Sequence, residues 1–214
     1  MKNTIIFLSL LVVLVGGTIY LTFQKTELAP VISTVATTTT TTTTPSKTLT
    51  TYTNQDPDFS FNYPADFNLD EGTRPSFEGN WSSLSQATGT VYATLTLPRS
   101  FQPGTNFSEA TVSFAGSTNA TTTCTDLPND MQIKSEVVQI GGQEFIKVEV
   151  ADAGAGNFYQ TTVYRRLVSD TCLSIESTIH STNIGVYDPG TVKEFDQTKT
   201  AALLWTVVNS LKFN

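Results

Sequence analysis

A run of nineteen uncharged residues near the N-terminus, from Ile5 to Phe23, limits what this chain can fold into more than any other feature. At 1.5 Å per residue, a helix of this length spans about 28 Å, close to the ~30 Å hydrocarbon core of a bilayer. Tyr20 and Phe23 stand near its C-terminal end, where aromatic side chains suit a membrane interface. The run therefore predicts a transmembrane signal-anchor within residues 1–24, with the N-terminus inside.

A cleaved signal peptide is the alternative interpretation of this run. Such peptides usually have an apolar region of about 7–15 residues followed by a small-x-small site, whereas this run is longer and no such site follows it closely. Both interpretations place the rest of the chain outside the cytoplasm, at a cell surface or in a periplasm.

Residues 25–50 are predicted to be a disordered linker. Eight consecutive threonines occupy positions 37–44, followed by Pro45 and Ser46. The segment has no amphipathic period, so it has no apolar face to bury. The folded domain then begins at residue 51 and extends to residue 214.

The charge of the domain argues against one class of partner. Beyond residue 50 the chain has nine basic and eighteen acidic residues, a net charge of −9. A domain this acidic repels a phosphate backbone, and no basic stripe with interleaved aromatics is present. We therefore predict no nucleic-acid partner.

Short alternating runs of apolar and polar residues predict β-strands through most of the domain. Two of these runs are joined by Gly141-Gly142, a strong signal for a β-hairpin. The predicted strands are residues 59–63, 90–97, 110–115, 136–140, 144–150, 158–167 and 171–179, with a flexible connection over residues 151–156.

One helix is predicted at the C-terminus, because Ala201, Leu204, Val208 and Leu211 recur at helical spacing. Thr191 in a capping box and Asp196 are competing N-caps. The helix should lie across one face of the sheet. The predicted class is therefore α+β: an antiparallel β-sheet meander packed by a C-terminal amphipathic helix, preceded by the transmembrane helix.

The two cysteines, Cys124 and Cys172, predict one disulfide, because an even count in an extracytoplasmic domain favours pairing. A redox-active pair is the alternative, but such pairs usually occur as C-x-x-C. The bridge would join the Thr- and Asn-rich loop around Cys124 to the strand that begins near Cys172.

The order of elements resembles the PsbP-like fold. The features that carry this resemblance are Phe59-Ser-Phe-Asn-Tyr-Pro64, the segment Thr105–Ala110 and the closing stretch Trp205–Phe213, within residues 51–214. The chain is also similar to bacterial membrane-anchored proteins that carry this domain after a low-complexity linker. The resemblance implies an antiparallel sheet flanked by helices, and a binding or assembly role. The residues behind the metal-linked role of photosynthetic members have no match here, so no activity follows from it.

Four residues form the candidate ligand surface: Arg165, Arg166, His180 and Asp152. The adjacent arginines should point to opposite faces of their strand, and one of them should pair with a carboxylate or contact a ligand. His180 is the sole histidine of the chain, and a catalytic Ser–His–Asp set would need it. A surface histidine is the simpler interpretation. Asp152 stands in the predicted glycine-rich connection.

The acidic groups Asp56-Pro-Asp58 and Asp70-Glu71 lack the spacing of a calcium loop, so a turn is the simpler interpretation of the first. We predict no catalytic, cofactor or metal site. The favoured function is a membrane-tethered extracytoplasmic binding or assembly module with a protein or envelope-polymer partner. The alternatives are a cell-surface hydrolase with an unfamiliar site, and a structural or adhesin-type surface protein.

Overall fold

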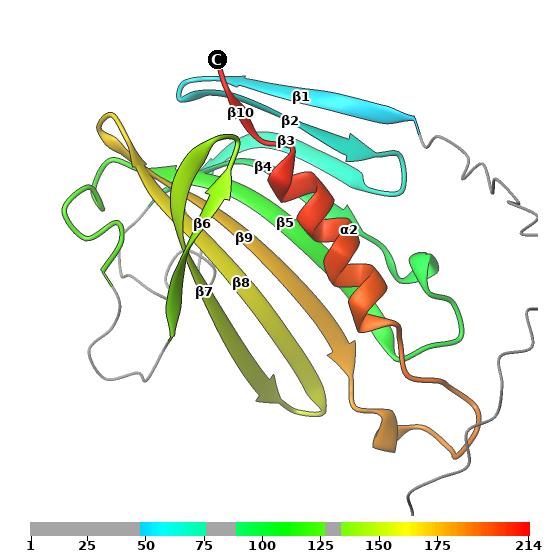
Figure 1. Ribbon diagram of the computed structural model, residues 1–214. Helices are drawn as coiled ribbons and strands as arrows, with labels where there is room; N and C mark the ends of the chain where they lie inside the picture. Colours follow the sequence, from blue (N-terminus) through cyan, green and yellow to red (C-terminus); the bar gives the residue numbers. More distant parts are fainter. Residues whose placement is uncertain (1–47, 76–88, 127–133) are drawn as a thin grey trace, which may run out of the picture. The chain divides into compact units, whose positions relative to one another are not determined.

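The computed structural model describes residues 48–75, 89–126 and 134–214 (Figure 1). Strands make up 58% of these residues, and one α-helix is present among them. The predicted α+β class is therefore wrong, because the described part is mostly β. Stretches rich in Thr, Gln and Asp, which the sequence pattern left as connections, are paired strands in the structure. Pairing between backbones does not require alternating apolar residues, so this pattern could not reveal these strands.

The predicted membrane segment and linker lie outside the described residues. Within the described ranges, no helix is long and apolar enough to cross a membrane. The first described strand begins at Leu49, just before the predicted start of the domain.

The larger sheet has seven antiparallel strands in the order β3-β4-β5-β9-β8-β7-β6. Its last four strands form a meander joined by tight turns. Gly141 and Gly142 connect β6 and β7 with positive φ angles of 59° and 75°, a conformation that favours glycine. The strands are β3 (Asn68–Pro75), β4 (Thr90–Leu97), β5 (Phe107–Ser117), β6 (Ser135–Ile140), β7 (Gln143–Gly154), β8 (Asn157–Val168) and β9 (Thr171–Thr182).

The smaller sheet has three strands in the order β1-β2-β10: β1 (Leu49–Gln55), β2 (Asp58–Pro64) and β10 (Lys212–Phe213). Its buried aromatics pack on the larger sheet. Phe61 stacks on Phe114 of β5, with ring centroids 4.0 Å apart and an interplanar angle of 6°. Phe59 contacts the same ring at 5.9 Å. The two sheets therefore share one hydrophobic core.

Helix α2 (Gln197–Asn209) completes this core. Asp196 is its N-cap, because the carboxylate accepts a hydrogen bond from the backbone N–H of Lys199 (2.8 Å); the alternative capping box at Thr191 is wrong. Leu204 and Val208 are buried as predicted, but Ala201 is exposed. The helix contacts β2, β5 and β9. Figure 1 shows that it does not extend over β7 and β8.

Both ends of the helix are held by polar side chains. At its start, the buried Gln102 accepts a hydrogen bond from the Asp196 N–H (2.7 Å) and donates to the Thr200 hydroxyl (2.6 Å). At its end, the Ser210 hydroxyl donates to the Asn62 carbonyl (3.0 Å) and accepts from the Asn62 N–H (2.7 Å). The position of α2 on the sheet is therefore fixed at both termini.

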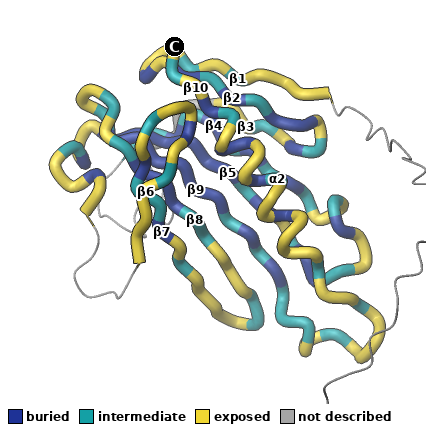
Figure 2. The backbone as a smooth tube through the Cα atoms, viewed as in Figure 1, coloured by how far each residue is buried: buried dark blue, intermediate teal, exposed yellow. Residues whose placement is uncertain are grey.

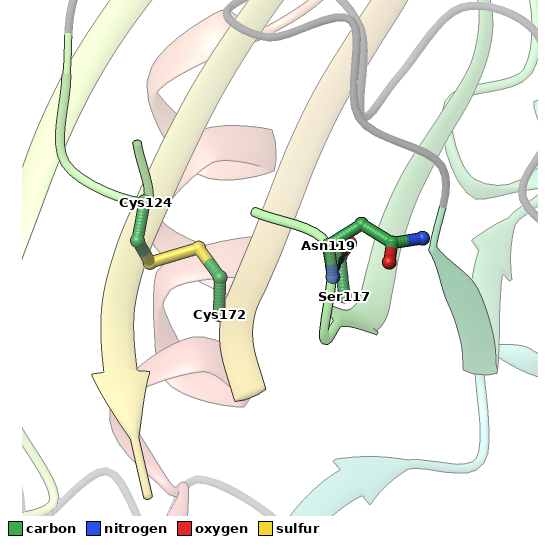
Figure 3. The surroundings of a disulfide bond; sticks show 4 residues. All are labelled: Ser117, Asn119, Cys124 and Cys172. Atoms are coloured by element: carbon green, nitrogen blue, oxygen red, sulfur yellow. Dashed lines mark hydrogen bonds between the residues drawn. A yellow bond between two sulfur atoms is a disulfide. The ribbon is translucent and has the colours of Figure 1, made fainter. Parts of the chain in front are cut away.

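The disulfide Cys124–Cys172 is present, with 5.3 Å between the Cα atoms (Figure 3). It lies on the face of the larger sheet opposite α2, which we call the far face. There it packs with Val91, Ala115 and Ala120 in a small apolar cluster. The bridge joins the loop after β5 to the start of strand β9, as the sequence predicts.

Replacing both cysteines by alanine should lower the free energy of unfolding by about 4 kcal/mol, because the bridge closes a loop of 48 residues in the unfolded chain. Urea denaturation of the full-length protein measures this change, with Thr122→Ala as a control at an exposed position of the same loop. A loss below about 1 kcal/mol would contradict a structural role for the bridge.

Candidate functional site

A groove lies beside helix α2, over strands β7 and β8, which the helix leaves uncovered, and over the adjoining part of β9. Its larger part, the Trp205 compartment, has a volume of about 580 Å³. Its smaller part, the Phe158 compartment, has a volume of about 440 Å³. Both volumes fall in the range typical of ligand sites. The groove is therefore the candidate binding site.

The two compartments adjoin each other. Ala151, Gln160, Ile179 and Gln197 line both of them. Gln197 Nε2, on the first turn of α2, donates a hydrogen bond to Gln160 Oε1 on β8 (2.7 Å). This bond joins the helix to the uncovered strands at the boundary between the compartments. Exposed amide groups of this kind both donate and accept, so they can exchange this bond for bonds to a ligand.

Aromatic side chains form the apolar part of the Trp205 compartment. Trp205 of α2 is 39% exposed, so part of its ring is accessible to a ligand. Its ring lies 5.9 Å from that of Tyr164 on β8. Burial raises the pKa of the Tyr164 phenol to about 12, so this hydroxyl stays protonated and can donate. The pair offers a ligand one flat apolar surface and one neutral donor.

Lys147 and Glu149, two charged residues that line the Trp205 compartment, form an ion pair that also includes Glu136. Lys147 Nζ lies 2.7 Å from carboxylate oxygens of both Glu136 and Glu149. These hydrogen bonds, first that of Glu136, raise the pKa of Lys147 above its ordinary value. The lysine is therefore a fixed cation held between two anions rather than a free ammonium group. This arrangement favours a ligand recognised by hydrogen bonding and apolar contact over a small anion.

The four residues of the predicted ligand surface do not converge. Arg165 and His180 both lie on the far face, but Arg165 is opposite Ser174, six residues along β9 from His180. At ~3.3 Å per residue, this separation is about 20 Å. Arg166 lies on the opposite side of β8 from Arg165, as predicted, and its Nη1 donates to the Glu144 carbonyl (3.2 Å).

Asp152 and His180 belong to one row of the far face, separated by Tyr159, which is directly opposite both. The rings of Tyr159 and His180 stack with centroids 4.5 Å apart. His180 Nε2 is 2.8 Å from Asn157 Oδ1. Among the described residues, no serine or cysteine side chain is hydrogen-bonded to His180, so the arrangement is that of a packed surface histidine.

The acidic groups singled out in the sequence form no described metal site. Asp56 and Pro57 make the tight connection between β1 and β2, because Gln55 pairs directly with Asp58. Asp70 and Glu71 are successive residues of β3 and so point to opposite faces. Across the described ranges, no group of three His, Cys, Asp or Glu side chains could hold a metal ion.

Glu176 is a notable residue that the sequence alone did not single out as a site. It lies on the far face of β9, opposite Val163 and Ser113, and is only 4% exposed. Neither carboxylate oxygen has a hydrogen-bond partner among the described residues. Burial raises the pKa of Glu176 to about 8, and the charge of neighbouring Arg165 opposes this rise. The sequence alternation places Glu176 on the same face of the strand as Cys172 and Ser174. This pattern alone does not show that both faces of β9 are buried at Glu176.

Glu176 should make stability depend on pH in the direction opposite to that of a typical paired carboxylate. The folded state binds its proton more tightly than the unfolded state, so the free energy of unfolding is highest near pH 4.5 and falls as the pH rises to about 8. The slope is at most about 1.4 kcal/mol per pH unit for one proton.

Urea denaturation at several pH values across this window measures the effect. The variant Glu176→Gln should abolish the fall, whereas Glu109→Gln, an exposed carboxylate on the same face, should retain it. An unchanged pH dependence in Glu176→Gln would show that the carboxyl is ionised in the fold at neutral pH.

No family model and no curated protein matches the chain. Several solved structures show weak likeness, among them the following two. A crystal structure from Bacteroides thetaiotaomicron is 16% identical with a TM-score of 0.38, and the match covers 73% of this chain but only 45% of that one. LpqN, involved in cell envelope biogenesis of Mycobacterium tuberculosis, is 8% identical with a TM-score of 0.28, covering 78% and 84% of the two chains. Similarity this low does not indicate a function for the chain.

Proposed function

We propose that this protein is an extracytoplasmic binding module whose ligand occupies the groove between α2 and strands β7–β9. The observation that carries the proposal is a two-part groove with a partly exposed tryptophan on one side and exchangeable amides where the two parts meet. Apolar concave sites with a few convergent polar groups are the usual form of ligand sites. The partner is a protein segment, an envelope polymer or a small ligand.

The proposed location outside the cytoplasm draws on two features. The apolar run Ile5–Phe23 would hold the chain at a membrane, and the Thr-rich stretch would separate the domain from it. The Cys124–Cys172 bridge supports this location, because disulfides persist in oxidising compartments. The PsbP-like resemblance is part of the same proposal and agrees with a binding or assembly role.

The alternative of a surface hydrolase has less support. A general base near neutral pH would most simply be His180, but this residue lies on the far face, stacked on Tyr159 and bonded to Asn157. The groove side chains described here contain no histidine. A purely structural surface protein would not need a groove of this volume. We therefore place ligand binding ahead of both.

Fragment screening by NMR tests the groove. Compounds that bind the full-length chain should shift the side-chain amide signals of Gln160 and Gln197. The variant Trp205→Ala should weaken the binding of these compounds at least about ten-fold, because it removes the apolar surface. The matched control is Leu167→Ala, which truncates a similarly exposed apolar residue on the far face. Binding that maps to the far face, or turnover of hydrolase substrates that His180→Ala abolishes, would contradict the proposal.

Cell fractionation tests the location. The full-length chain should remain in the membrane fraction after alkaline carbonate washing, and deletion of residues 1–24 should release it, because the apolar run would be the main attachment. Thiol labelling of intact cells should find Cys124 and Cys172 oxidised. A soluble cytoplasmic product with both thiols free would contradict the proposed location.

A further inference from the structure

Helix α2 forms one wall of the groove through Gln197, Ala201 and Trp205, which all line the Trp205 compartment. These residues are four positions apart, so they lie in one row along the helix. At 1.5 Å per residue, the row is about 12 Å long. Exposed positions occur along α2 and along β7 and β8, as Figure 2 shows. The wall therefore has an amide at one end, an aromatic ring at the other, and a small residue between them that leaves room for a ligand.

Strands β7, β8 and β9 form the floor of the Trp205 compartment. Thr162 is directly opposite Glu149 on one side and Ser177 on the other, and all three line this compartment. Glu149 is held by Lys147 (2.7 Å), which is the sole cation among the described lining residues of the groove. A ligand therefore meets hydroxyl and amide groups here rather than a free positive charge.

The Gln160–Gln197 pair has the hydrogen-bonding capacity that a hydroxyl group needs. The bond between these residues joins Gln197 Nε2 to Gln160 Oε1 and uses neither Gln160 Nε2 nor Gln197 Oε1. The pair thus keeps a donor and an acceptor on neighbouring side chains. A ligand hydroxyl accepts one hydrogen bond and donates another, so a single hydroxyl group can bond to both atoms.

Three other classes of ligand fit this lining less well. An acyl chain would cover Gln160, Thr162 and Ser177 without offering them hydrogen bonds, which costs free energy. A small anion would find Lys147 already held by carboxylates, in a domain of net charge −9. A peptide strand attaches mainly through backbone hydrogen bonds, but the floor is a sheet face whose backbone groups pair within the sheet.

We propose that the groove binds a neutral glycan, with one sugar ring stacked on Trp205 and sugar hydroxyl groups bonded to Gln160 and Gln197. This inference rests on the proposed function and names the ligand class of that same site. A sugar ring has a side of C–H groups, which the electron-rich face of an indole attracts, and a rim of hydroxyl groups that both donate and accept. The 12 Å row on α2 is long enough for more than one sugar ring.

A glycan array probed with the full-length protein tests the ligand class. The protein is kept in a polyoxyethylene detergent, which contains no sugar. Neutral oligosaccharides should bind, and related forms that carry uronic or sialic acid should bind at least about ten-fold more weakly. Titration calorimetry with the neutral oligosaccharide that binds best on the array then measures its Kd. A preference for the acidic forms would overturn the inference.

Two tyrosine substitutions on α2 test whether the glycan lies in the groove. Ala201→Tyr fills the space between the amide and the indole, and should weaken glycan binding about ten-fold or more by steric exclusion. Ala202→Tyr adds the same side chain at the next exposed position, which does not line the groove, and should bind like the wild type. Equal affinity of the two variants would show that the glycan binds elsewhere and would overturn the inference.

A substitution in the amide pair tests hydrogen bonding to the sugar. Gln160→Met keeps the length of the side chain but removes its amide, and should weaken glycan binding about ten-fold because a sugar hydroxyl loses a partner. The matched control is Gln139→Met, which removes an exposed amide of β6 outside the groove and should leave the Kd unchanged. An unchanged Kd in Gln160→Met would count against the proposed contacts.

The outcomes separate this inference from the proposed function. If apolar fragments or peptides bind in the groove and no neutral glycan does, the ligand class is wrong and the groove remains a binding site. If no compound of any class binds in the groove, both proposals are wrong. Circular dichroism checks that each variant is folded. Should Ala201→Tyr not fold, Ala201→Leu replaces it, with Ala202→Leu as its control.

Discussion

The stacking of Phe61 on Phe114 is the contact on which the arrangement of the domain depends. It joins the smaller sheet to the larger one and buries the aromatic side of β2. The smaller sheet in turn bonds the C-terminal end of α2 through Asn62 and Ser210. With Gln102 holding the other end, the helix is confined to β2, β5 and β9, and only the side chains of Gln197 and Trp205 reach β8. The uncovered strands and the groove follow from this confinement.

The two faces of the larger sheet consequently differ in character. The helix face is apolar beneath α2 and becomes polar where the helix ends its coverage, at Gln160 and Gln197. On the far face, a buried section beside the disulfide contains Arg165 and Glu176, and an exposed section contains Asp152 and Tyr159. The proposed ligand contacts lie mainly on the helix face, whereas the disulfide and Glu176 lie on the far face.

Sequence patterns predicted the strands that alternate clearly and missed those that do not. Residues 90–97 coincide with β4, because every second residue is buried. β1 was missed because its threonines and amides show no apolar period, and its pairing with β2 comes from backbone bonds. The opposite directions of Arg165 and Arg166 followed from strand geometry alone. The groove was not predictable, because it depends on where α2 rests, which is decided by contacts between residues about 90 to 150 positions apart.

The pairing of β10 with β2 has a consequence for the order of folding. Phe213 is opposite Phe59, so strands from the two ends of the domain are neighbours. The meander β6–β9 can form from local hairpins as soon as it is synthesised, because its contacts are close in sequence. The smaller sheet, by contrast, stays incomplete until residues 212–213 emerge. During synthesis, the nascent chain therefore keeps the aromatics of β2 without their final neighbours until the last strand emerges.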